Sequence, residues 1–386
     1  MRSTVIGVWV LAAAAVGMSS PAQAETGLEQ KIDILSDEVD KLRAQLEKQQ
    51  ARGEGGKSSI STTVGGYGEL HYNNLDSGKE IDFHRFVLFV SHRFNERTRF
   101  FSELELEHSN TENGGAVELE QAFLEFDLGV KQRVQAGLFI LPIGILNEVH
   151  EPPVFYGVER NPVETNIIPV TWWEGGAGMS GEIGPGLRYD VAVTSGLKVP
   201  TTGSNAYVMR EGRQNVSAAN ANDPAYTARL RWAGLPGLEL AAAMNYQRDI
   251  TQSAAGIAPI SALLTEAHAI YSLGSFTIKG LYAQWKLGAG DAATGPATGP
   301  APGKDRQMGW YVEPSYKLSR TWGVFTRYNE WDNSAGSANN TDSKKRQTNV
   351  GVSYWPHPAV VVKADLQNQR GAINNDGFNL GLGYMF

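Results

Sequence analysis

The last nine residues of the chain most strictly limit what it can fold into. They read FNLGLGYMF and place an apolar residue at every second position: Phe378, Leu380, Leu382, Tyr384 and Phe386. Because side chains alternate between the two faces of a β-strand, this segment predicts a strand with one continuous apolar face. A terminal strand of this kind exposes an unpaired edge unless it pairs with another strand, and pairing with the first strand would close a barrel.

The same alternation recurs between residue 61 and the C-terminus. Abundant glycine (43) and aromatic residues (14 Tyr, 14 Phe, 9 Trp) suit an all-β chain with many turns. We find sixteen candidate strands, each about 20 residues from the next, which fits membrane strands with short and long links. They are residues 64–73, 83–91, 99–108, 118–128, 133–140, 171–181, 187–197, 226–233, 238–247, 263–271, 276–287, 308–318, 322–332, 348–355, 360–368 and 378–386.

Charges in the middle of these segments indicate what surrounds the strands. Glu103, Glu105 and Glu107 lie on one face of their segment, and Leu104 and Leu106 lie on the other. A charged face opposite an apolar face needs water on one side and lipid on the other. Aromatic residues near the segment ends suit the two membrane interfaces. The sequence therefore predicts an all-β, 16-stranded antiparallel transmembrane β-barrel in residues 61–386, with a wet lumen.

The first sixty residues have a different pattern. Arg2, the apolar residues 5–16 and the small residues around Gln23 predict a cleaved signal peptide at residues 1–24 and hence export. Residues 25–50 predict a short periplasmic coiled coil for oligomerisation, with a single amphipathic helix as the alternative. Its heptad positions are Leu28, Ile32, Leu35, Val39, Leu42 and Leu46, and the β-branched pair favours two strands. Residues 51–60 read as a Gly-rich linker.

The C-terminal strand resembles that of bacterial outer-membrane porins, which typically end in Phe after alternating apolar residues. The stretches VELEQAFLEF (117–126), QAGLFILPIG (135–144) and YNEWDN (328–333) resemble, more narrowly, the phosphate-selective porin O/P-like family and related porins with an N-terminal coiled coil. The resemblance implies a homotrimer in outer-membrane lipid. It also implies that the outer-membrane assembly machinery reads Phe378, Leu380, Leu382, Tyr384 and Phe386 as its signal.

A long connection at residues 147–169 is the candidate constriction. In porins of this kind the third loop commonly folds into the barrel, and four prolines would stiffen this one. Its titratable residues are Glu148, His150, Glu151, Glu159, Arg160 and Glu164. The alternative is a surface loop whose charges only keep it solvated. Four glutamates against one arginine argue against phosphate selectivity and predict a weak preference for cations.

Alternation also assigns charges to the lumen of the predicted barrel. We assign to an acidic wall Glu69, Glu103, Glu105, Glu107, Glu125 and Asp127. We assign to a basic wall Arg188, Arg229, Arg231, Lys279, Arg327 and Lys363. Opposed walls would create a transverse field that orients polar solutes. The alternative is unordered charge on a solvated surface.

Other functional classes find little support in the sequence. The chain has no cysteine, its net charge is −7, and it contains no G-x-S-x-G motif. Its seven histidines lack the spacing of metal ligands, so we expect no metal site and no cofactor. The absent catalytic motif and the negative net charge lead us to expect no enzyme and no nucleic-acid partner. We predict passive diffusion of small hydrophilic solutes and ions. The alternatives are a channel selective for phosphate, pyrophosphate or dicarboxylates, and a structural tether whose coiled coil grips peptidoglycan or a periplasmic partner.

Overall fold

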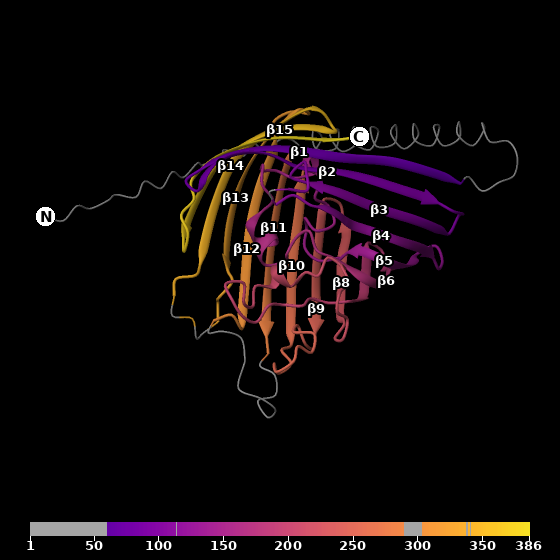
Figure 1. Cartoon of the computed structure of the whole chain (residues 1–386). Coiled ribbons are helices and arrows are strands. Elements are labelled where there is room, and N and C mark those ends of the chain that lie inside the picture. Colours follow the sequence, from indigo (N-terminus) through magenta and orange to yellow (C-terminus); the bar gives the residue numbers. More distant parts are fainter. Residues whose placement is uncertain (1–59, 113, 289–302, 337–338, 340) are drawn as a thin grey trace, which may run out of the picture. The chain divides into compact units, whose positions relative to one another are not determined.

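The computed structural model describes residues 60–386, except residues 113, 289–302, 337–338 and 340. The predicted signal peptide, coiled coil and most of the linker lie outside the described residues. In the described part, sixteen antiparallel strands form a closed barrel (Figure 1). Each strand pairs with its neighbours in sequence, and β16 pairs with β1. The predicted all-β barrel is confirmed, and each of the sixteen predicted segments overlaps one strand.

The strands and short helices have the following bounds. The first eight strands are β1 (Ser61–Leu75), β2 (Gly78–Arg93), β3 (Thr98–Glu107), β4 (Val117–Asp127), β5 (Gln132–Ile140), β6 (Trp173–Gly184), β7 (Leu187–Thr194) and β8 (Ala225–Leu235). The others are β9 (Leu238–Gln247), β10 (Ala262–Leu273), β11 (Phe276–Leu287), β12 (Arg306–Lys317), β13 (Trp322–Asp332), β14 (Lys345–His357), β15 (Val360–Gly371) and β16 (Gly377–Met385). The connections hold η1 (Pro152–Val154), α2 (Pro162–Asn166) and η2 (Met209–Gly212).

Every connection at one end of the barrel is a turn of two to four residues, whereas the long connections all lie at the other end, together with the short turn 76–77. Two-residue turns at 185–186, 236–237, 274–275 and 358–359 share one end, and the connections 141–172 and 195–224 share the other. Membrane barrels place short turns in the periplasm and long loops outside the cell. The long connections therefore belong to the extracellular end.

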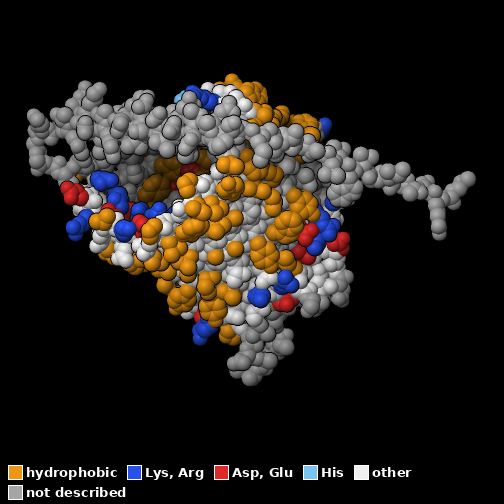
Figure 2. Space-filling model, turned by 180° about the vertical axis from the view of Figure 1, so that it is seen from behind, with side chains coloured by type: hydrophobic (Ala, Val, Ile, Leu, Met, Phe, Trp, Pro, Cys, Tyr) orange, Lys and Arg blue, Asp and Glu red, His pale blue; other side chains and the backbone are white. Residues whose placement is uncertain are grey.

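The outer face is apolar and the inner face is polar, as β15 illustrates. Val362 and Leu366 are 46% and 65% exposed, whereas Lys363 and Asp365, between them in sequence, are each 4% exposed. Figure 2 shows hydrophobic side chains gathered over the outer wall, with charged side chains toward its rims. This arrangement suits lipid outside and water inside. No helix among the described residues is long and apolar enough to span a membrane.

Backbone pairing and a glycine close the barrel at its C-terminus. Phe386 donates its N–H to Gly66 O at 2.9 Å, and Gly66 N–H donates to Phe386 O at 3.0 Å. A Cβ atom on Gly66 would lie 2.2 Å from Val87 O, so only glycine fits there. Leu380 and Leu382 are more than two-fifths exposed on the outer face, as the alternation predicted.

The connection between β5 and β6, residues 141–172, folds into the barrel; we call it the inward loop. Ile167 O accepts a hydrogen bond from Trp285 Nε1 at 2.7 Å, and Pro153 O accepts one from Trp355 Nε1 at 3.0 Å. Fully buried apolar residues of the loop, including Ile143 and Ile167, share one hydrophobic cluster with side chains of β10–β13. Apolar packing thus holds the loop against one wall of the barrel.

Candidate functional site

A buried carboxylate ties the inward loop to β12. Asn161 caps α2 by accepting the Glu164 N–H at 2.8 Å, and Pro162 occupies the first helical position. The Glu164 carboxylate accepts Leu146 N–H at 2.6 Å and Tyr311 O–H at 2.8 Å. Burial raises the pKa of Glu164, although these hydrogen bonds oppose the rise. Glu164 was predicted to charge the constriction, but it is fully buried because its oxygens hold the loop together.

A second carboxylate ties the same loop to β1. Glu159 Oε1 accepts a hydrogen bond from Asn73 Nδ2 at 2.9 Å and lies 3.0 Å from His71 Nδ1. Burial would raise the pKa of Glu159, but the His71 hydrogen bond and charge lower it to about 2. The next residue, Val158, donates its N–H to Asp365 Oδ2 at 2.8 Å. The loop therefore crosses the lumen and is fixed to strands on both sides of the barrel closure.

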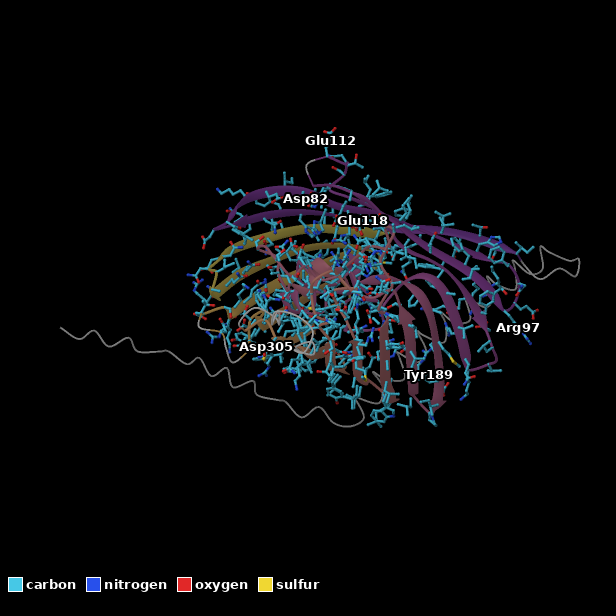
Figure 3. All side chains as sticks on the ribbon, turned by 60° about the horizontal axis from the view of Figure 1, so that its bottom comes forward. Asp82, Arg97, Glu112, Glu118, Tyr189 and Asp305 are labelled. Carbon is cyan, nitrogen blue, oxygen red and sulfur yellow. The ribbon has the colours of Figure 1, made fainter. Side chains whose placement is uncertain are left out.

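A charged cavity of about 560 Å³ lies between the inward loop and the wall formed by β1–β4; we call it the pore cavity. Two of its acidic residues, Asp82 and Glu118, are labelled in Figure 3, away from Arg97 and Tyr189 at the end with short turns. The strands contribute to its lining the acidic residues Glu69, Glu80, Asp82, Glu107, Glu118 and Glu120. The inward loop contributes Glu159 and Arg160.

Two further arginines of the pore cavity come from the connection 195–224. Arg210 Nη1 donates to Val170 O at 2.6 Å, and Arg213 Nη1 donates to Thr171 O at 2.5 Å. Burial, together with the neighbouring charges of Arg213 and Arg160, lowers the pKa of Arg210 to about 10. Neither residue was predicted from the sequence, because a loop has no periodicity that would reveal where its side chains point. The only signal was the pair of arginines in the stretch MREGR.

The predicted acidic wall carries basic residues as well. Arg85 Nε lies 2.7 Å from Glu69 Oε1, and its Nη1 lies 3.2 Å from Glu105 Oε1. Arg99 pairs with Glu125 and Asp127 at 2.7 and 2.6 Å. These ion pairs correct the prediction of a wall with one sign of charge. Close carboxylates on neighbouring strands repel one another unless a cation lies between them.

The remaining acidic residues divide between the cavity and the space behind the inward loop. Glu107 lines the pore cavity, as its place on β3 allows. Glu103 is 1% exposed; its Oε2 accepts a hydrogen bond from Gln121 Nε2 at 2.7 Å, and its Oε1 lies 3.4 Å from His150 Nε2. His150 is 3% exposed, so it does not line the pore cavity as a constriction residue would. Glu151 is partly exposed just before η1.

The predicted basic wall does not face the pore cavity. Arg229 pairs with Glu148 of the inward loop and with Asp190, and Arg327 Nη1 lies 3.3 Å from Glu313 Oε2. Lys363 Nζ lies 3.6 Å from the centroid of the Phe155 ring. The other three basic residues line two smaller cavities of about 230 and 210 Å³; they are Arg188, Arg231 and Lys279. The predicted basic residues thus lie inside the barrel but away from the pore cavity, and the arginines that face the acidic strands there lie on loops.

A closed barrel with an apolar outside, a charged inside and a loop folded across the lumen defines a channel-forming membrane barrel. The sequence pattern of the Gram-negative porin family matches residues 10–377, so the chain belongs to this family. An uncharacterized protein of Aquifex aeolicus (strain VF5) is 29% identical over 350 residues, which are 84% of this chain and 80% of the relative.

Solved structures with the same fold include a porin and an outer-membrane channel. An anion-selective porin from Comamonas acidovorans superposes with a TM-score of 0.60 at 11% identity, over 85% of this chain and 100% of the other. The channel DcaP of Acinetobacter baumannii gives 0.58 at 12% identity, over 86% and 99% of the two chains. Family and fold together make this protein an outer-membrane channel for small solutes, and they indicate a channel and not an enzyme.

Proposed function

We propose that this channel passes small hydrophilic solutes and ions passively, with a weak preference for cations, and is narrowest between the inward loop and β1–β4. The lining of the pore cavity carries this proposal, because it holds seven carboxylates and four guanidinium groups. A lining with more negative than positive charge raises the local concentration of cations.

Negative and positive side chains also lie on opposite sides of the pore cavity. Glu118 and Glu120 lie on β4, whereas Arg160, Arg210 and Arg213 are held against the backbone and side chains of the inward loop. We infer that the field between them orients dipolar solutes as they pass. A unit charge about 8 Å from an ion in water contributes about 0.5 kcal/mol, roughly a factor of two in ion preference.

Paired charge variants test this arrangement in planar bilayers. R210Q/R213Q should raise the K⁺ to Cl⁻ permeability ratio by about two- to fourfold, and E118Q/E120Q should lower it by a similar factor. Glu112→Gln is the matched control, because Glu112 is exposed on the connection between β3 and β4 and does not line the cavity. Equal reversal potentials for both double variants and the wild type would refute the proposed route.

Two arginines of the pore cavity give one specific reason to keep the substrate-selective alternative. Arg160 Nε and Nη2 and Arg213 Nε are buried without a hydrogen-bond partner among the described protein atoms. Such donors suit a phosphate or a carboxylate. A saturable block of KCl conductance by phosphate, pyrophosphate or succinate would favour this alternative and the narrower O/P-like resemblance. Our proposal expects conductance to change only with ionic strength.

We further propose that the channel is a homotrimer in outer-membrane lipid. An outer membrane protein of Vibrio cholerae, OmpT, was solved in a trimer form, and it has a TM-score of 0.58 with this chain at 12% identity. Residues 25–50 remain our candidate for a periplasmic coiled coil that supports this assembly or tethers the barrel to peptidoglycan. Deleting them should lower trimer yield on cross-linking. Normal trimers that no longer co-sediment with peptidoglycan would favour the tether.

A further inference from the structure

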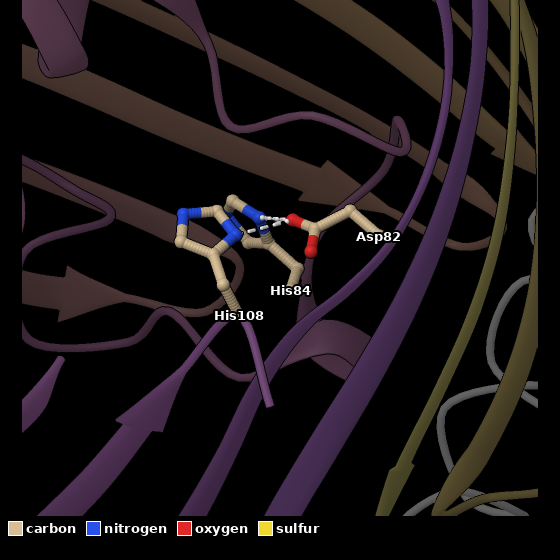
Figure 4. A group of neighbouring side chains, drawn as sticks. All are labelled: Asp82, His84 and His108. Carbon is tan, nitrogen blue, oxygen red and sulfur yellow. Dashed lines mark hydrogen bonds and ion pairs between the residues drawn. The ribbon is translucent and has the colours of Figure 1, made fainter. Parts of the chain in front are cut away.

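Two histidines and an aspartate meet at one point on the wall of the pore cavity. Asp82 and His84 lie on β2, and His108 directly follows β3 (Figure 4). Both imidazole Nδ1 atoms reach the same carboxylate oxygen, Asp82 Oδ2, at 2.9 Å from His84 and 2.8 Å from His108. We propose that Asp82, His84 and His108 bind a divalent first-row transition-metal cation such as Zn²⁺.

The distances in this group suit such a cation after a small expansion. One potential ligand atom from each residue lies within 4.8 Å of the other two. Zinc binds imidazole nitrogen at about 2.0–2.1 Å and carboxylate oxygen at about 2.0–2.2 Å, so tetrahedral ligands lie about 3.3 Å apart. The nitrogen–oxygen pairs therefore need to separate by about half an ångström. The side chains of His84 and His108 are 26% and 34% exposed, which leaves room for this movement.

The strand pairing fixes these three residues beside one another. The register of β2 against β1 shifts between Asp82 and Arg85, and at this β-bulge Asp82, His84 and Arg85 all line the pore cavity. Arg85 of β2 lies opposite Glu107 of β3 in the strand register. The His108 N–H donates a hydrogen bond to His84 O at 3.2 Å. His108 has φ of +52°, a left-handed conformation that is uncommon outside glycine. Ligands from two strands have no fixed sequence spacing, which explains why the sequence predicted no metal site.

The surroundings leave one coordination position open. The His71 ring stacks on the His84 ring with centroids 4.7 Å apart, but its two nitrogens already face Glu69 at 3.2 Å and Glu159 at 3.0 Å. His71 is thus occupied and does not serve as a fourth ligand. Glu80 and Glu107 line the same cavity and favour a cation there. A bound metal would keep a position for water or a passing solute, as open zinc sites do.

A second group with three potential ligands lies behind the inward loop and provides a control. It comprises Glu103, Glu120 and His150, all buried. His150 Nδ1 already contacts Asn147 O at 3.0 Å, and its Nε2 lies 3.4 and 3.7 Å from the two carboxylates. Only Glu120 of this group reaches the lining of the pore cavity, and both Glu103 and His150 are buried away from it. We therefore assign the cation to the group with the exposed imidazoles.

Metal binding is tested on the full-length protein in detergent by calorimetric titration with Zn²⁺. We expect one Zn²⁺ per chain in the wild type, and an affinity at least tenfold lower in His84→Ala, His108→Ala and the near-isosteric Asp82→Asn. Co²⁺ provides a second readout, because its visible absorption reports nitrogen and oxygen ligands; the bands should be lost in H84A/H108A. Variants are compared only when their circular dichroism matches that of the wild-type barrel.

Two control variants make the assignment specific. His357→Ala removes an exposed histidine at the end of β14, and His150→Ala disables the buried group; both should bind Zn²⁺ like the wild type. The proposal is overturned if the wild type binds no Zn²⁺, if H84A/H108A binds it with unchanged affinity, or if only His150→Ala loses it.

The site also has a consequence for conduction, which rests on the proposed function. A cation held in the pore cavity should reduce the conductance of the wild type in planar bilayers relative to the same channels without Zn²⁺. H84A/H108A should show at least tenfold lower sensitivity to Zn²⁺ than the wild type. A wild type that binds Zn²⁺ in the titration yet conducts equally well would instead contradict the proposed route through this cavity.

Discussion

Glu159 shows how one side chain both lines the pore cavity and fixes the inward loop. Its pKa in the folded protein is about 2, against 4.5 for an unperturbed glutamate, because the opposing hydrogen bond and charge of His71 outweigh burial. A carboxyl with a lowered folded pKa stabilises the fold above its unfolded pKa, and this stabilisation is lost as pH falls through the folded pKa. The contribution of Glu159 should therefore be complete at pH 7 and fade between about pH 4.5 and 2.

The pH dependence of stability in Glu159→Gln tests this ionised contact. The variant should unfold at a lower temperature than the wild type at pH 7, and the gap should shrink from about pH 4.5 to 2. Thermal unfolding followed by circular dichroism in detergent measures the gap. Glu151→Gln, in the same loop, is the matched control. A gap that is absent at pH 7, or that stays constant down to pH 2.5, would contradict the role of Glu159.

For single residues, the sequence predicted which strand side chains face the lumen, but it did not predict which residues those side chains contact. Parity along a strand placed Glu103, Glu105 and Lys363 on the buried inner face correctly. It could not predict that Arg85 would neutralise two glutamates, because ion pairing depends on the register between strands. Nor could it place Arg210, since a loop residue has no alternating pattern to follow.

The inward loop depends on buried polar ties as well as apolar packing. Tyr311→Phe removes the O–H that Glu164 accepts at 2.8 Å and leaves a buried carboxylate short of a donor. Loss of one partner of a buried group costs about 1–3 kcal/mol. We expect the free energy of unfolding in detergent to fall by that amount. Tyr316→Phe, on the same strand but 48% exposed, should change it little. Equal effects of the two substitutions would argue against a stabilising hydrogen bond between Tyr311 and Glu164.

The last strand, β16, combines barrel closure with the predicted assembly signal. Phe386→Ala keeps the two backbone hydrogen bonds to Gly66 and removes only the outward-facing ring, which is 62% exposed. We expect less folded barrel in the outer-membrane fraction, with unchanged ion selectivity in the molecules that insert. Phe276→Ala, which removes an exposed ring from β11, is the control. Normal insertion of Phe386→Ala would show that its ring is not part of the signal.

The barrel as a whole was largely predictable from the sequence, because period-2 alternation and inward charges are local features of each strand. Strand β6 carries little of this signal, since its stretch EGGAGMSG has few side chains to alternate. The pore cavity was less predictable, because it forms where the inward loop, the connection 195–224 and four strands meet. Contacts between these segments depend on tertiary packing, which cannot be predicted from the alternation of side chains along a single strand.

The reversal potential of the wild-type channel tests the central claim most directly. Single channels in a planar bilayer would separate a tenfold KCl gradient, with no divalent cation present. The excess of carboxylates over guanidinium groups in the pore cavity predicts a potential of the sign that cation permeation gives, well short of the value for an ideal cation channel. A clearly anion-shifted potential would contradict the account.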